Sequence, residues 1–184
     1  PSCRAGCGGW YSFDIGAWHI IGLNSNCEAV SCTAGSAQET WLKADLAAHP
    51  NACTLAMWHH PRFSSGISGN NSGMATLWRD LYQAGADVVL TGHDHDYERF
   101  TPLDGDGYAD SQHGMVEFVV GTGGADHYAF RKTPAMGSAV RIQDQFGVLT
   151  LTLQPKGYDW AFHALDGKTL DSGHASCHGA PSGS

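Results

Sequence analysis

The pattern of apolar and polar positions predicts strands and a helix in the first part of the chain. Residues 11–15 and 18–23 are rich in aromatic and β-branched side chains, and Gly16 lies between them, which favours two adjacent strands. The sequence Ser36-Ala37-Gln38-Glu39 has the form of a capping box. It predicts the start of a helix that ends at His49-Pro50, because proline cannot continue it.

A strand–helix–strand unit follows, and histidines come directly after each strand. The apolar run over residues 54–58 leads into His59-His60-Pro61, and the run over residues 87–90 leads into His93-Asp94-His95. Between them, a helix ended by Gly85 is predicted by apolar side chains at helical spacing, namely Met74, Leu77, Trp78, Leu81 and Tyr82. Because a right-handed crossover makes the two strands parallel, we expect both groups of histidines at one edge of the sheet.

The last part of the chain shows strand patterns only. We expect strands over residues 116–120, 147–153, 158–164 and 168–170, with turn signals between the last three. The chain is interpreted as a single domain over residues 1–173 followed by a tail over residues 174–184.

The composition supports a folded domain and excludes two classes of partner. The 184 residues are 42% hydrophobic and 15% charged, which is typical of a globular chain with a core. The formal net charge is −8 and no basic cluster is present, so we expect neither nucleic acid nor a membrane surface as a partner. No apolar run reaches the roughly 20 residues of a membrane span.

The cysteines indicate disulfides and an oxidising compartment. Six are present, an even number, in a chain whose Gly, Ser, Thr and Asn usage looks extracellular. One of several possible connectivities pairs Cys3 with Cys7, Cys27 with Cys32, and Cys53 with Cys177. A structural zinc site is the alternative. We therefore expect a secreted or periplasmic protein.

Four histidines carry the candidate chemistry, namely His59, His60, His93 and His95. Imidazoles two residues apart beyond a buried strand, with others at the end of a neighbouring strand, predict a metal site. The other seven histidines share no spacing and are interpreted as ordinary side chains. Asp94 and Asp96 alternate away from the histidines and are interpreted as solvated carboxylates. The glycine run over residues 121–124 is expected to form a loop, since no helix pattern follows it.

The stretch Gly92-His93-Asp94-His95-Asp96-Tyr97-Glu98-Arg99 resembles the Gly-His-x-His-x-Tyr-Glu-Arg motif of the purple acid phosphatases, a branch of the calcineurin-like metallophosphoesterases. Residues 55–63 match a second family feature, a strand that ends in a metal-binding His with Pro two positions later. The resemblance covers roughly residues 9–165. It implies an α/β fold of the metallophosphoesterase type, a β-sandwich flanked by helices.

This resemblance also implies a function, that of a phosphatase which hydrolyses phosphate esters with a metal-activated hydroxide. The centre would nominally be dinuclear, with divalent or trivalent transition metals (Zn, Fe or Mn). His59 and His93 would bind one metal and His95 the other. His60 would be catalytic, protonating the leaving group, and both His60 and Tyr97 would contact the substrate.

Part of the family pattern is missing. The remaining ligands of the family come from motifs of the form Asp-x-His/Gly, Gly-Asp-x-x-Asp/Tyr and Gly-Asn-His-Asp/Glu, for which Gly105-Asp106-Gly107-Tyr108 and Gly69-Asn70-Asn71 are imperfect matches. The chain thus resembles a carboxyl-terminal half that supplies one of two packed sheets. We expect an apolar face left for an amino-terminal segment or a partner chain. With so few ligands, weak or mononuclear metal binding is expected.

Two other functions remain open from the sequence. A noncatalytic half-domain would bind a ligand or partner and at most one metal. A mononuclear zinc hydrolase would need His59, His93 and His95 to converge on one ion, against the arrangement that the family resemblance implies. The metal content per chain separates a noncatalytic module from an enzyme.

Overall fold

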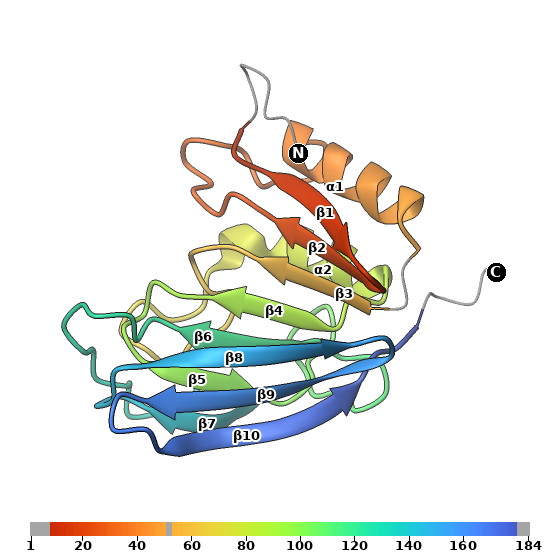
Figure 1. Ribbon diagram of the computed structural model, residues 1–184. Helices are drawn as coiled ribbons and strands as arrows, with labels where there is room; N and C mark the ends of the chain where they lie inside the picture. Colours follow the sequence, from red (N-terminus) through yellow and green to blue (C-terminus); the bar gives the residue numbers. More distant parts are fainter. Residues whose placement is uncertain (1–7, 51–52, 180–184) are drawn as a thin grey trace.

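The computed structural model describes residues 8–50 and 53–179 of the chain and folds them into two sheets and two α-helices (Figure 1). The elements in chain order are β1 (Tyr11–Ile15), β2 (Trp18–Gly22), α1 (Ala37–Ala48), β3 (Cys53–Met57), the 3₁₀ helix η1 (Ser72–Met74), α2 (Ala75–Gln83), β4 (Val88–Thr91), β5 (Tyr97–Phe100), β6 (Val116–Val120), β7 (Ser138–Ile142), β8 (Gly147–Gln154), β9 (Gly157–Ala164) and β10 (Thr169–Ser176). The large sheet has the order β1-β2-β3-β4-β6-β5-β7, and the small sheet has the order β10-β9-β8. Strands β2, β3, β4 and β6 are parallel to one another.

The hydrophobic pattern predicted most of these elements. The strand–helix–strand unit is confirmed, because β3 and β4 are parallel neighbours with α2 between them in the sequence. The cap of α1 is also confirmed, since Ser36 Oγ accepts a hydrogen bond from the Glu39 backbone N–H at 3.2 Å. Strands β5 and β7 were not predicted. Strand β10 continues to Ser176, so the residues expected to start a tail at position 174 lie in a strand instead.

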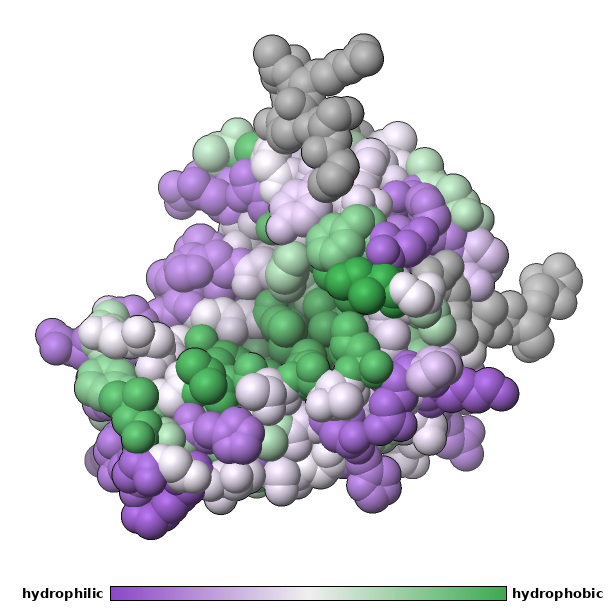
Figure 2. Space-filling view, in the orientation of Figure 1, coloured by the Kyte–Doolittle hydropathy of each residue, from purple (hydrophilic) through white to green (hydrophobic). Residues whose placement is uncertain are grey.

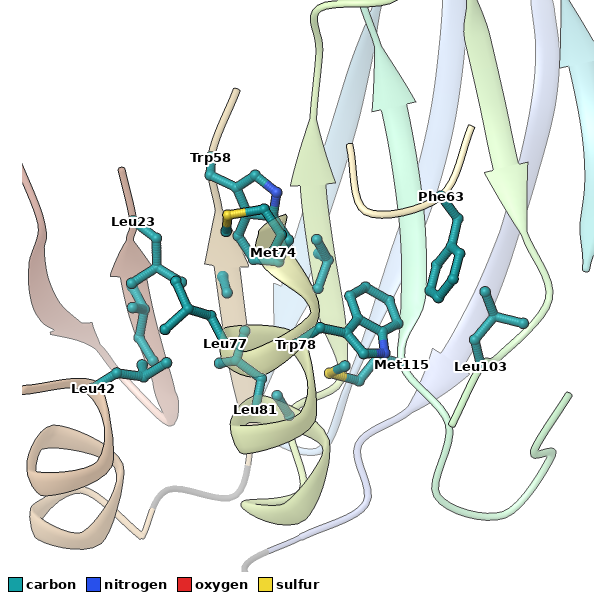
Figure 3. Close-up of a cluster of buried hydrophobic side chains, with 14 of the residues drawn as sticks. Leu23, Leu42, Trp58, Phe63, Met74, Leu77, Trp78, Leu81, Leu103 and Met115 are labelled. Atoms are coloured by element: carbon teal, nitrogen blue, oxygen red, sulfur yellow. The ribbon is translucent and has the colours of Figure 1, made fainter. Parts of the chain in front are cut away.

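Helices α1 and α2 cover one face of the large sheet. Leu77, Trp78 and Leu81 of α2 are fully buried and share one cluster with Leu42 of α1 and Phe63 (Figure 3). Each large apolar side chain removed from water in this way stabilises the fold by roughly 1.5–3 kcal/mol. This packing holds the sheet, and with it the ends of its strands, in a fixed position.

The small sheet packs on the opposite face of the large sheet. The rings of Tyr97 and Phe162 stack with centroids 4.1 Å apart, and Trp18 meets Tyr158 edge to face at 5.9 Å. Both pairs join one strand of the large sheet to β9 of the small sheet. The chain therefore contributes strands to both layers of the sandwich, whereas the sequence led us to expect one layer only.

Part of this second face remains open. Strands β8, β9 and β10 lie over the β5–β7 side of the large sheet, and Figure 2 shows hydrophobic side chains gathered beside them. Partly buried apolar side chains on this face include Phe13, Met57 and Leu90 of the large sheet and Leu151 of β8. An apolar face open to a further segment was expected from the sequence, and it is present over part of the sheet.

Two disulfides are present in the described chain, one between residues close in sequence and one between residues far apart. Cys27–Cys32 and Cys53–Cys177 each have a Cα–Cα distance of 5.3 Å, and they confirm two of the predicted pairs. The predicted pair Cys3–Cys7 lies outside the described residues. Within the part of the chain that the structure describes, no helix has both the length and the apolar character needed to cross a membrane.

Candidate metal centre

The carboxyl ends of β2, β3, β4 and β6 meet at one edge of the large sheet, and polar side chains follow each of them. Met57 pairs with Leu90 in the β3–β4 register. The ladder continues beyond the strands, because the Trp58 backbone N–H donates to the Leu90 carbonyl at 3.1 Å and Gly92 donates to the His59 carbonyl at 3.0 Å. The chain therefore leaves β3 and β4 side by side, at the edge where open α/β sheets place their ligands.

Three histidines meet at this edge. His59 Nε2 lies 3.1 Å from His93 Nδ1, and the centroid of the His60 ring lies 4.4 Å from that of His93. Ring nitrogens of all three residues lie within 4.8 Å of one another. The backbone of His93 has a φ of 64°, in the left-handed region that side chains other than glycine rarely adopt. Such strain is often found at functional sites, where the surrounding structure holds it in place.

The surroundings of these histidines favour their neutral forms. Partial burial lowers the pKa of His59, His60 and His93 below the ordinary histidine value. The neighbouring imidazoles lower each pKa further, since a second positive charge would be repelled. A neutral imidazole carries the lone pair that a metal ion requires, so the cluster is ready to bind a cation at neutral pH.

Ser25 positions His60, and the sequence analysis did not single it out. Ser25 lies beyond β2 and is buried, and its Oγ is 2.9 Å from both the backbone N and the Nδ1 of His60. The hydroxyl accepts a hydrogen bond from the backbone N–H, so its own proton can be donated to Nδ1. This arrangement favours the tautomer of His60 with its proton on Nε2. Ser25 follows a strand parallel to and next to that of His59, and this placement could have identified it from the sequence.

His95 stands apart from the other three histidines and is held by the loop after β6. Its Nδ1 lies 2.7 Å from the carbonyl oxygen of Asp126, which can only accept, so Nδ1 carries the proton. The remaining nitrogen, Nε2, therefore has a lone pair available for a metal, as is usual for ligating histidines. Tyr128 stacks on the ring with a centroid distance of 4.0 Å. The expected loop at residues 121–124 is confirmed, and Asp126 and Tyr128, which follow it, make both contacts.

Buried carboxylates hold the loop that follows His60. Glu117, Glu98 and Asp94 accept hydrogen bonds from backbone N–H groups of residues 62–68 at distances between 2.7 and 3.0 Å. Asp94 and Asp96 are fully buried, which corrects their interpretation as solvated carboxylates. The alternation that turns them away from the histidines turns them into the protein, where Asp94 contacts this loop. Burial raises the pKa of Asp96 to about 8.

Tyr97 lies between the two sheets and not at the histidine edge. Its side chain is fully buried, and its hydroxyl donates to Asp171 of β10 at 2.6 Å. The expectation that Tyr97 contacts the substrate is therefore corrected, because the alternation along β5 points it at Phe162 of the small sheet. Arg99 pairs with the same carboxylate at 2.7 Å. Tyr97 and Arg99 of the motif therefore join the large sheet to the small sheet.

A cavity of about 270 Å³ adjoins His60 and His93 and is otherwise lined by Pro61 and residues 68–72. Its wall includes the near-match Gly69-Asn70-Asn71, in which the two amide oxygens accept hydrogen bonds from backbone N–H groups. The other near-match places Asp106 in an ion pair with Arg79 of α2. The cavity is open and polar, so it suits a small polar ligand.

The donor set at this edge fits a transition metal in its chemistry, but it has too few ligands for a dinuclear centre. Neutral imidazoles are common ligands of zinc and iron. Among the described residues, the ligand group at this edge contains His59, His60 and His93 and no carboxylate. Three or four protein ligands are usual for a tight zinc site, and carboxylates commonly complete dinuclear centres.

Comparison with known proteins places this geometry in context. No family model matches the chain. In sequence, the chain is 35% identical to purple acid phosphatase 18 of Arabidopsis thaliana over 166 residues, which are 85% of this chain and 37% of that protein. In structure, it is similar to purple acid phosphatase PPD1 from yellow lupin (Lupinus luteus) seeds, with a TM-score of 0.78, 22% identity, and coverage of 91% of this chain and 32% of that chain.

A second solved structure with the same fold is GAP50, described as the anchor in the inner membrane complex of Plasmodium. The TM-score is 0.74 at 17% identity, with coverage of 94% of this chain and 56% of that chain. The α/β sandwich expected from the sequence is thereby confirmed as a metallophosphoesterase-type fold.

The chain therefore resembles the purple acid phosphatases, a branch of the calcineurin-like metallophosphoesterases. It matches the carboxyl-terminal part of these relatives. It spans about a third of their length.

Proposed function

We propose that this chain carries part of the active site of a metal-dependent phosphoesterase. The observation that supports this most directly is the meeting of His59 and His93 at 3.1 Å, at the carboxyl ends of two parallel strands, in a chain with purple acid phosphatase relatives. The substrate class is phosphate esters, since that is the chemistry of the family. The lowered pKa values of the histidines favour metal binding at neutral pH.

Each histidine has a role in the proposal. His59 and His93 hold one metal ion, and His95 holds a second through its Nε2. Zinc, iron or manganese, when bound, supplies positive charge for the phosphoryl oxygens and an activated water. His60 contacts the substrate from beside the 270 Å³ cavity and, in its imidazolium form, donates a proton to the leaving group and becomes neutral. Ser25 holds the ring of His60 in position through its contact with Nδ1.

A further polypeptide segment completes the site in this proposal. The relatives are about three times as long, and the described residues offer too few ligands for two metals. The open apolar face beside β8 fits an additional segment, either an amino-terminal part of the same protein or a partner chain. Such a segment would bring the carboxylates that this edge lacks. The disulfides favour a secreted or periplasmic location.

The second candidate function is a noncatalytic module that binds a ligand or partner and at most one metal. It is favoured by the absence of carboxylates from the described histidine group. The fold does not decide against it, because one solved protein with this fold is described as an anchor.

Metal content and activity separate the two functions. The chain is dialysed without chelator, and its metal content is measured by elemental mass spectrometry together with hydrolysis of an aryl phosphate. Bound metal and activity that are present in the parent chain and lost in His93→Ala support the phosphoesterase, since a metal ligand is removed. No metal at this edge, or activity that survives His93→Ala, contradicts it and leaves the noncatalytic module. His163→Ala, in β9, is the matched control and is expected to leave both quantities unchanged.

A further inference from the structure

A second group of metal-binding side chains lies at the other end of the large sheet, away from the candidate metal centre. It consists of Asp14 in β1, His19 near the start of β2, and His49 at the carboxyl end of α1. One ligand atom from each of the three lies within 4.8 Å of the others. His59 follows the opposite end of the adjacent parallel strand, β3, so the two groups are separated by the length of the strands.

Asp45 fixes the protons of both imidazoles. His19 Nε2 lies 2.8 Å from Asp45 Oδ2, and His49 Nδ1 lies 2.8 Å from the Asp45 carbonyl oxygen. A carboxylate and a carbonyl only accept hydrogen bonds, so each of these two nitrogens carries a proton. In the neutral rings, the lone pairs are therefore on His19 Nδ1 and His49 Nε2.

The rings of His19 and His49 lie next to one another. The rings of His19 and His49 are stacked, with centroids 4.4 Å apart and planes 10° apart. Asp45 contacts one nitrogen of each ring, so the other nitrogen of each ring remains as a possible metal ligand. A carboxylate that accepts the second N–H of a histidine is the usual support for a metal-ligating imidazole, since it fixes the tautomer and raises the basicity of the ligand.

Asp14 is the third member of the group. Its Oδ1 lies 2.7 Å from His19 Nδ1, and the side chain is 49% exposed, while that of His19 is 1% exposed. A carboxylate oxygen and a lone-pair nitrogen at this separation repel one another unless a cation lies between them. That cation is either a proton, which makes His19 an imidazolium, or a metal ion. Around a tetrahedral zinc ion, ligand atoms lie roughly 3.4 Å apart, which a small rotation of Asp14 provides.

We infer that Asp14, His19 and His49 bind one divalent zinc ion. Asp45 orients both histidines by accepting a hydrogen bond from the other nitrogen of each ring. Two imidazoles and one carboxylate leave a fourth position for water, which is a donor set that zinc accepts. The ion joins the β1–β2 hairpin to the end of α1, so its binding stabilises the folded chain. This site is independent of the phosphoesterase proposal, because it shares no residue with the candidate metal centre.

Zinc titration by calorimetry tests the inference. The chain carries His59→Ala, His93→Ala and His95→Ala, so that the candidate metal centre cannot contribute. One zinc per chain is expected to bind. Asp14→Asn and His49→Gln, both on this background, are each expected to weaken binding by at least roughly tenfold, as loss of even a supporting group does at many sites. His163→Gln is the matched control and is expected to leave zinc affinity unchanged.

A second measurement keeps the test valid if the triple variant does not fold. In the otherwise unaltered chain, Asp14→Asn combined with His49→Gln is expected to bind one zinc fewer per chain. Zinc is also expected to raise the melting temperature through this site, and the double variant removes that part of the rise. The inference is overturned if the triple variant binds no zinc, or if Asp14→Asn and His49→Gln leave zinc binding unchanged. A proton then bridges Asp14 and His19.

Discussion

Arg99 of the large sheet and Asp171 of the small sheet form a two-point ion pair. Arg99 Nε lies 2.7 Å from Asp171 Oδ2, and Arg99 Nη2 lies 3.1 Å from Asp171 Oδ1. Tyr97 and Trp160 donate to the same carboxylate at 2.6 and 3.2 Å. The pair lies in the interior of the sandwich, so the three hydrogen bonds from Tyr97 and Arg99 connect the layers where little water can replace them.

Asp171→Ala is therefore expected to destabilise the protein by about 3 kcal/mol, because it leaves the Arg99 charge half-buried without a partner. Denaturant unfolding measures the change. Asp166→Ala, which removes an exposed ion pair with Lys168, is the control and is expected to change little. A similar effect of both substitutions would contradict a structural role for the Arg99–Asp171 pair.

Glu117 is expected to make the stability of the protein depend on pH. Burial raises the pKa of Glu117 to about 8, although hydrogen bonds from the backbone N–H groups of Phe63 and Arg62 oppose the shift. The unfolded chain has an ordinary pKa near ~4.3, so the folded state binds the proton more tightly. The stability from this group is fully present below about pH 4.3 and is lost as the pH rises to about 8.

Glu117→Gln is expected to flatten that decline, which is on the order of a few kcal/mol between pH 5 and 8. Urea unfolding at several pH values in this window measures it. Part of the slope is expected to persist, since burial also raises the pKa of Asp96 to about 8. Glu28→Gln, at an exposed position, serves as control and is expected to keep the full slope. Equal slopes in the parent and in Glu117→Gln would show that Glu117 does not cause the decline.

The two described disulfides are expected to differ in their effect on stability. Cys53–Cys177 spans 124 residues of sequence, and Cys27–Cys32 spans 5. Because a longer closed loop removes more entropy from the unfolded chain, removal of the first pair by alanine is expected to cost about 5 kcal/mol, and removal of the second about 2 kcal/mol. Urea unfolding under non-reducing conditions compares the two double variants. Equal losses would mean that native-state contacts, and not loop length, set the effect.

Ser25→Ala is expected to release His60 from its present tautomer. The hydroxyl lies 2.9 Å from His60 Nδ1, and no methyl group can replace that hydrogen bond. Long-range nitrogen–proton NMR of the imidazole reports the tautomer without any need for activity. If the proposed phosphoesterase is active, its kcat is expected to fall roughly tenfold, as for loss of other groups that orient a catalytic side chain.

Ser25→Thr keeps the hydroxyl and is the matched control for that experiment. It is expected to restore both the tautomer and the rate. An unchanged imidazole spectrum in Ser25→Ala would rule out the positioning role, whatever happens to activity.

Local patterns in the sequence were sufficient for the parts of the fold that depend on neighbouring residues. The apolar runs of β3 and β4, the helical spacing of α2, and the cap at Ser36 each express a period or a hydrogen bond within a few residues. The common edge of His59 and His93 followed as well, because the handedness of a strand–helix–strand crossover has essentially one solution. Strand β5 was missed because its polar residues are satisfied by partners far away in the chain.

The tertiary structure decided everything that depends on which distant segments meet. Tyr97 belongs to a motif associated with an active site, yet β9 and β10 cover it. Asp94 was interpreted as solvated from the sequence, but the loop over residues 62–68 covers it. The partners of Ser25 and His95 come from other strand ends, and Asp14, His19 and His49 have no common spacing at all. A periodic pattern records which way a side chain faces, and only packing determines what it faces.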